Sequence, residues 1–143
     1  MQHPDIVPIS AGWYELDEDY SYIFTYSGLH LKITVPKGFK TDGASIPRWL
    51  WSILGVGRDG LHRAAAVVHD FLYKHQGRLP KGSLQIMRKD GAWEDSDYTP
   101  TRRDSDKLFL NIMKDAGVIL WRRRLMYRAV RVAGKEAWEG RVT

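Results

Sequence analysis

Cysteine is absent from the 143 residues, and long apolar runs are absent as well. Without cysteine the chain can form no disulfide and no thiolate metal site, which is typical of proteins that fold in a reducing compartment. No stretch reaches the roughly 18 apolar residues that a membrane-spanning helix needs. The first residues lack the basic and apolar regions of a secretion signal, so we expect none.

Charge is unevenly distributed along the chain. Residues 121–143 hold seven Lys or Arg against two Glu, whereas the remainder is balanced, so this segment carries the net charge of +5. Helical spacing over 118–138 predicts an apolar face with Trp121, Leu125, Ala129 and Val132, and places Met126, Val130, Ala133 and Ala137 beside it. The opposite face would present the cations Arg124, Arg128, Arg131 and Lys135. Such a face suits an acidic partner, phosphates, a subunit contact or simply solvent.

The order of the patterns predicts an α+β fold in a single domain, 1–143. Residues 1–12 predict an extended arm, and aromatic and β-branched residues over 13–35 predict an antiparallel hairpin that turns at Ser27 and Gly28. Three main helices are expected over about 61–75, from an N-cap at Thr101 to Gly117, and over 118–138. We expect a further short buried helix near 49–54. We also expect a surface insertion over 79–100, in which residues 89–91 form the tip of a small exposed hairpin.

An apolar helical run over residues 64–73 delivers the most informative side chains. His69 and Tyr73 lie four residues apart and so share one face of the helix, with Asp70 beside them. Apolar neighbours indicate burial, and a buried unpaired polar group costs roughly 1–3 kcal/mol. We therefore expect Asp106, on the next helix, to lie within about 2.6–3.2 Å of His69 or to be bridged to it by Tyr73 or a water.

Three motifs together resemble a known family. Residues 38–47 read GFKTDGASIP, residues 65–73 read AAVVHDFLY and residues 106–113 read DKLFLNIM, followed by the basic, aromatic C-terminal helix. This pattern resembles a phage and prophage protein family of unknown function. The resemblance implies a phage or prophage origin and a place in the virion, in the tail, neck or entry apparatus, but no established activity. We expect a non-catalytic structural or interaction role. Its partners would be other virion proteins rather than nucleic acid, and it would reside in the host cytoplasm and then in the particle.

A second resemblance implies chemistry. The His-Asp-x-x-Tyr helix followed by an Asp on the next helix is similar to calcium-dependent phospholipases that cleave the sn-2 ester. The similarity implies that His69 is a general base acting through a water, that Asp106 orients it, and that Tyr73 hydrogen-bonds Asp106. The implied calcium ligands are Asp70 and backbone carbonyls near Asp42 and Gly43, and phospholipid would be the substrate.

Two alternatives to phospholipase chemistry remain at this point. In the first, His69 and Asp70 are structural and anchor the loop over 41–45 to the core. In the second, a metal-dependent phosphohydrolase uses a His…His-Asp…Asp set. That set needs an upstream helical histidine, whereas His30 lies on a predicted strand and His62 lies in the same helix. Calcium binding separates the phospholipase from a non-catalytic protein.

Overall fold

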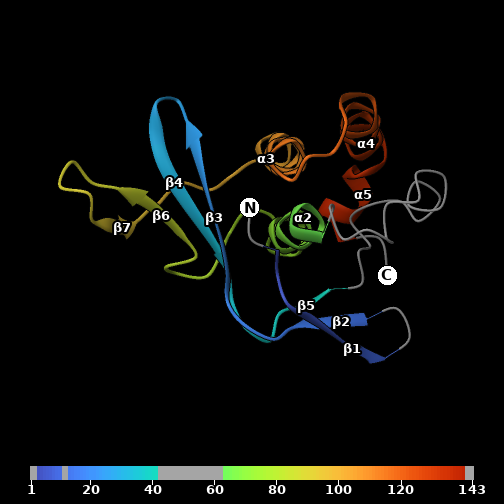
Figure 1. Cartoon of the computed structure of the whole chain (residues 1–143), viewed down its shortest axis with the longest axis horizontal. Helices are drawn as coiled ribbons and strands as arrows, with labels where there is room; N and C mark the ends of the chain where they lie inside the picture. Colours follow the sequence, from blue (N-terminus) through green and yellow to red (C-terminus); the bar gives the residue numbers. More distant parts are fainter. Residues whose placement is uncertain (1–2, 11–12, 42–62, 141–143) are drawn as a thin grey trace.

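The computed structural model describes residues 3–10, 13–41 and 63–140, and Figure 1 shows their arrangement. Antiparallel strands come first and helices follow, which confirms the α+β class. One sheet has the order β1-β2-β5, formed by β1 (Ile6–Ser10), β2 (Trp13–Leu16) and β5 (Lys40–Thr41). The other has the order β3-β4-β6-β7, formed by β3 (Tyr20–Tyr26), β4 (Leu29–Val35), β6 (Leu84–Met87) and β7 (Trp93–Asp95).

The central hairpin forms as predicted. β3 and β4 pair from Tyr20–Val35 to Tyr26–Leu29, and the chain turns at Ser27 and Gly28, both with positive φ. A turn of that conformation matches the twist of the strands. The inward face of β4 is buried, except that Leu29, next to the turn, is 49% exposed. The hairpin therefore supplies one wall of the core.

Two segments contribute more to the sheets than their sequence predicts. Residues 1–12 predict an arm, but Ile6–Ser10 pairs with β2. In the segment 79–100 the predicted hairpin is confirmed, since β6 and β7 pair around residues 88–92, but β6 also pairs with β4 and buries Leu84 in the core. Short strands contain few residues in which an alternation of apolar and polar side chains could be recognised. Their pairing with distant segments is therefore hard to predict from the sequence.

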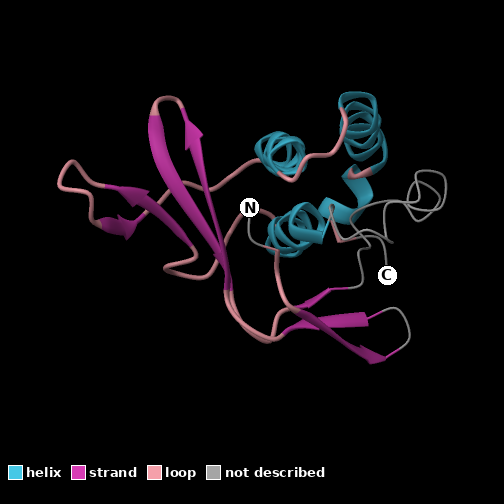
Figure 2. Ribbon diagram, viewed as in Figure 1, coloured by secondary structure: helices cyan, strands magenta, loops and turns pink. Residues whose placement is uncertain are grey.

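Four helices lie in the part of the chain that is described: α2 (Arg63–His75), α3 (Arg102–Asp115), α4 (Leu120–Ala133) and α5 (Lys135–Trp138). Figure 2 shows them gathered on one side of the sheets, with α2 innermost. The predicted N-cap is confirmed, since Thr101 and Asp104 form a reciprocal capping box. The predicted helix over 49–54 lies outside the described residues. None of the described helices is long and apolar enough to cross a bilayer.

The last predicted helix is divided. It breaks at Gly134, where a Cβ atom would stand 2.6 Å from the hydroxyl oxygen of Tyr73 and 2.4 Å from the carbonyl oxygen of Val130. Glycine is therefore needed for close approach, not for an unusual φ, which is −82°. The break lets α5 turn back so that the ring of Trp138 meets Tyr73 edge-on.

The prediction for the buried face of α4 is wrong in part. Ala129 is buried, but Trp121, Leu125 and Val132 are 55%, 41% and 85% exposed. Met126 and Val130, predicted to lie beside that face, are buried together with Ala129. Apolar residues occur on both sides of this helix, so periodicity alone does not identify the side that meets α3.

Candidate functional site

The site begins with the face that α2 turns toward α3. The helix ends where Gly77 allows a left-handed turn, and a side chain there would collide with the backbone of Pro100. The two helices run antiparallel: Tyr73 near the end of α2 meets Asp106 near the start of α3, whereas His69, one turn earlier, also packs against Phe109, further along α3. All three side chains are almost completely buried.

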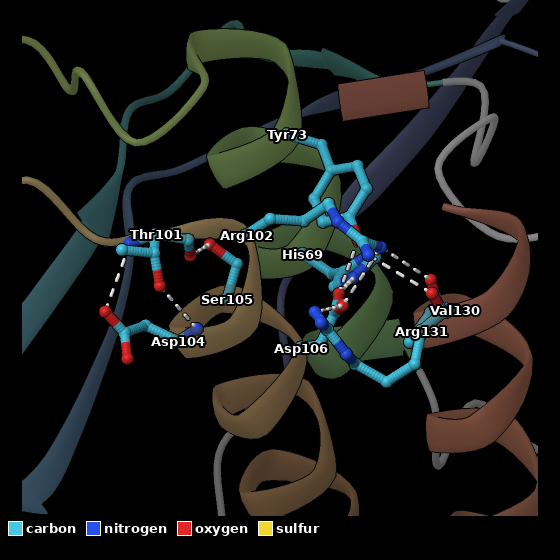
Figure 3. Close-up of polar contacts among 9 residues, drawn as sticks. All are labelled: His69, Tyr73, Thr101, Arg102, Asp104, Ser105, Asp106, Val130 and Arg131. Carbon is cyan, nitrogen blue, oxygen red and sulfur yellow. Dashed lines mark hydrogen bonds and ion pairs between the residues drawn. The ribbon is translucent and has the colours of Figure 1, made fainter. Parts of the chain in front are cut away.

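One carboxylate oxygen of Asp106 binds two partners from α2. Nε2 of His69 lies 2.7 Å from Oδ1, within the distance that the sequence predicts. The Tyr73 hydroxyl donates to the same oxygen at 2.5 Å. Figure 3 shows both contacts. Because the hydroxyl of a neutral tyrosine donates, Asp106 serves as the common acceptor.

The second oxygen of Asp106 faces two arginines that the sequence did not assign to the site. Nη1 of Arg131, on α4, donates to Oδ2 at 2.8 Å. Nη1 of Arg102 lies 3.6 Å from Oδ2, and its guanidinium also donates to the carbonyls of Val130 and Arg131 at 3.2 Å each. The cluster, defined as His69, Tyr73, Arg102, Asp106 and Arg131, therefore joins α2, α3 and α4.

These contacts set the protonation of the cluster. Burial alone would raise the pKa of Asp106, but hydrogen bonds from His69, Tyr73 and Arg131 outweigh it, so the pKa is lowered. Burial and the hydrogen bond to Asp106 raise the pKa of Tyr73. At neutral pH the carboxylate is therefore ionised and the phenol is neutral. This is the state in which every donor around Asp106 finds an acceptor.

Asp70 points to a different part of the molecule. Its Oδ2 accepts a hydrogen bond of 2.6 Å from the Thr41 hydroxyl, and Nζ of Lys74 lies 3.5 Å from the same oxygen. Lys74 also donates to the carbonyl of Lys40 at 3.3 Å. The Asp70 carboxylate is 2% exposed. These contacts fasten the outer side of α2 to β5.

The proposed calcium ligands fall partly outside the described residues, where Asp42 and Gly43 lie. Calcium takes six to eight oxygen ligands. Next to Asp70 the described part of the chain supplies the hydroxyl of Thr41 and, within 3.5 Å, the competing cation of Lys74. Within that part, no three His, Cys, Asp or Glu residues are grouped so as to hold a metal ion. Calcium binding at Asp70 stays a prediction.

Sequence comparison identifies a family that matches this chain and a relative. The profile of a family described as proteins of unknown function, DUF1353, matches residues 14–130. The chain belongs to the DUF1353 family. An uncharacterized protein of Sinorhizobium fredii, y4jT, is 30% identical over 123 residues, which make up 86% of this chain and 29% of that protein. The chain thus spans less than a third of this relative's length. No solved structure matches.

The DUF1353 match includes most of the cluster but ends just before its last member. His69, Tyr73, Arg102 and Asp106 lie within 14–130, and Arg131 follows directly. Sequence reasoning missed Arg102 and placed Arg131 on the outward cationic face rather than beside Asp106. Arg102 precedes Asp106 by four residues, a spacing that favours an ion pair on a helix. Arg131 offers no such signal, because its contact depends on how α4 packs against α3.

The predicted cationic face of this DUF1353 chain does not point to solvent as a whole. Arg131 turns inward to Asp106, and its side chain is 30% exposed. Arg124 and Arg128 on α4, and Lys135 on α5, are exposed. The residues open to a partner on this side are thus the latter three.

Proposed function

We propose that this chain is a non-catalytic, virion-associated protein of a phage or prophage that binds other virion proteins. One observation carries the non-catalytic part: both carboxylate oxygens of Asp106 are occupied by side chains from three helices. A general base needs a carboxylate whose charge stabilises the protonated histidine. Here two guanidinium groups compete for that charge, and such a cluster suits a structural joint.

Burial supports the same interpretation. The side chains of His69 and Asp106 are both 0% exposed. Removing Asp106 would take the shared acceptor away from the buried side chains of His69 and Tyr73, which is costly. The virion assignment rests on the three sequence motifs and their resemblance to phage and prophage proteins. The binding role rests on the exposed cations Arg124, Arg128 and Lys135, which lie in the segment that carries the net charge.

The proposal is tested on purified particles of the phage or prophage that encodes the chain. Mass spectrometry should detect the chain in them. Substitution of Arg124→Gln together with Arg128→Gln should lower incorporation while changing the free energy of unfolding by less than about 0.5 kcal/mol, because both residues are exposed. The matched control is Lys81→Gln with Lys89→Gln, which removes the same charge elsewhere. Particles that lack the wild-type chain would refute the virion role.

A second candidate is favoured by one specific observation. The contacts of Asp106 with Nε2 of His69 and with the hydroxyl of Tyr73 are those that the resemblance to calcium-dependent phospholipases implies. In this alternative the chain hydrolyses phospholipid esters during genome entry or release. Asp70 would then contribute to a calcium site.

Two measurements decide between the candidates. A hydrolase should release fatty acid from phospholipid vesicles in millimolar calcium, and His69→Gln should abolish the release. Calcium should also raise the melting temperature of the wild type but not of Asp70→Asn; saturation at a hundred times the dissociation constant contributes about 2.7 kcal/mol. If neither effect occurs, the hydrolase is excluded.

A further inference from the structure

The outer face of α3 lies between the β3–β4 hairpin and α4, as Figure 1 shows. Two hollows flank this face. One lies toward the hairpin and is mainly apolar; the other lies toward α4 and is mainly cationic. Lys107 and Asn111 line both hollows, so they form one continuous surface. The Asp106 cluster lies on the opposite, buried side of the helix.

The apolar hollow has a volume of about 220 Å³ and reaches between sheet and helix. Its walls include Phe24, Leu31, Leu84 and Leu108. A cavity of about 150 Å³ is enough to hold benzene. This hollow therefore has room for one aromatic or large aliphatic side chain. At its rim the rings of Tyr26 and Tyr98 stack, and the hydroxyl of Tyr98 donates to Asp104.

The cationic hollow, of about 320 Å³, is lined by Lys107 and Lys114 from α3 and by Arg123 and Arg124 from α4. Within the described ranges none of the four makes an ion pair. The carboxylates on this side of α3 already have partners: Asp104 accepts from Tyr98 and the N-cap, and Asp115 accepts from Tyr22. Arg123 donates to the carbonyl of Val118, and Lys107 lies close enough to Asp104 to help lower the pKa of that carboxylate. The positive charge that Lys114 and Arg124 add to this hollow is thus available to an external anion.

We propose that this surface binds an acidic segment of another protein, which inserts one aromatic or large aliphatic side chain into the apolar hollow. Its carboxylates would lie over Lys107, Lys114 and Arg124. Protein interfaces concentrate their affinity in such a buried anchor, surrounded by polar contacts. The inference rests on the proposed binding role and adds the class of partner and the place where it binds.

The chemistry favours protein over nucleic acid. A single-stranded nucleic acid binds along a groove with several aromatic side chains for successive bases. Here there is one apolar hollow, with room for one inserted group. It can hold a single anchor side chain of a peptide, whereas a run of successive bases would need several such places.

The test uses the whole protein and a library of random 16-residue peptides displayed on yeast. Selection at low salt should enrich peptides that combine several Asp or Glu with one large apolar residue. An enriched peptide, labelled with fluorescein, should bind at least about tenfold more weakly when that residue is replaced with Ala. Thr25→Trp, which places a ring at the exposed edge of the apolar hollow, should weaken the intact peptide similarly and leave the Ala peptide unchanged.

The charge is tested separately. Lys107→Gln with Lys114→Gln should weaken binding about tenfold and reduce its salt dependence, because salt screens exposed charges. Lys81→Gln with Lys89→Gln is the control and should change neither. Circular dichroism and melting temperature establish that each variant folds.

Three results would overturn the inference: enrichment of peptides without the acidic and apolar combination, binding that the Thr25 and Lys107/Lys114 variants leave unchanged, or tighter binding of a 20-nucleotide thymidine oligomer or of anionic vesicles. Detection of the chain in particles alongside any of these results would refute this inference alone. If the chain is absent from particles, the virion role is refuted, whatever the result of the peptide experiments.

Discussion

The helices α2 and α4 are similar in length and both contain many apolar residues, yet their surroundings differ. Nine of the 13 residues of α2 are buried, including His69 and Asp70. In α4 three of 14 are buried: Met126, Ala129 and Val130. The helix α2 contacts α3 and α5 as well as β4 and β5, whereas α4 packs against α3 and α5. Position between layers, rather than apolar content, decides which side chains leave water.

The comparison also explains where polar side chains acquire fixed partners. On α2, burial forces each polar group to be paired. On α4, Arg131 acquires a partner because it lies where the helix meets Asp106, while Arg124 and Arg128 stay exposed. A single carboxylate between the two helices thus fixes the inner side of α4 and leaves its outer side open.

The largest expected effect on stability comes from removing the carboxylate of Asp106, which binds side chains of both α2 and α4. Asp106→Ala should lower the free energy of unfolding by about 3–5 kcal/mol, because it removes the acceptor shared by the buried His69 and Tyr73 on α2 and the partly exposed Arg131 on α4. Urea denaturation measures the change. The exposed Asp97→Ala serves as control and should cost less than about 0.5 kcal/mol. An equally small loss for Asp106→Ala would show that the cluster does not hold the helices together.

The same carboxylate predicts a pH dependence. The pKa of Asp106 is lowered in the folded protein, so its contribution is complete above the unfolded pKa of about 3.9 and is lost as pH falls through the folded value. The difference in stability between wild type and Asp106→Asn should therefore shrink below about pH 4. Denaturant titrations across pH 2–7 measure it. A difference that stays constant over this range would contradict the assignment.

A pair of substitutions within α4 tests the contrast between its buried side and its exposed side. Met126→Ala should cost about 2–5 kcal/mol, since Met126 is completely buried. Val132→Ala should cost less than about 0.5 kcal/mol, since Val132 is 85% exposed. Thermal unfolding of the two variants gives the values. Similar losses would mean that the outer side of α4 is covered in solution.

A smaller loss is expected where α4 ends against α2. Gly134→Ala introduces a methyl group 2.6 Å from the Tyr73 hydroxyl oxygen and should destabilise by about 1–3 kcal/mol, although alanine is otherwise the better helix former. In the double variant with Tyr73→Phe the two losses should be less than additive, because the clash with the hydroxyl is gone, whereas the one with the carbonyl oxygen of Val130 remains. Unchanged stability of Gly134→Ala would show that α2 and α4 are not held closely here.

Sequence patterns predicted those features that depend on neighbours along the chain. The hairpin turn at Ser27 and Gly28, the capping box of α3 and the spacing of His69 and Tyr73 are all local. The pairing with Asp106 was predictable because a buried histidine requires a partner and the next helix offered one. The ion pair of Arg131 was not, because it depends on the rotation of α4 about its axis.

The burial of α2 has a consequence for hydrogen exchange. A helix enclosed on nearly all sides cannot expose its amides through local opening, so those of Val68 and Leu72 should exchange only when the whole protein unfolds. The edge strand β7, whose residues are largely exposed, should exchange through local fluctuations long before. The difference in protection factors between α2 and β7 would then show how much more free energy is needed to open the helix that carries His69 than to open the edge of the sheet.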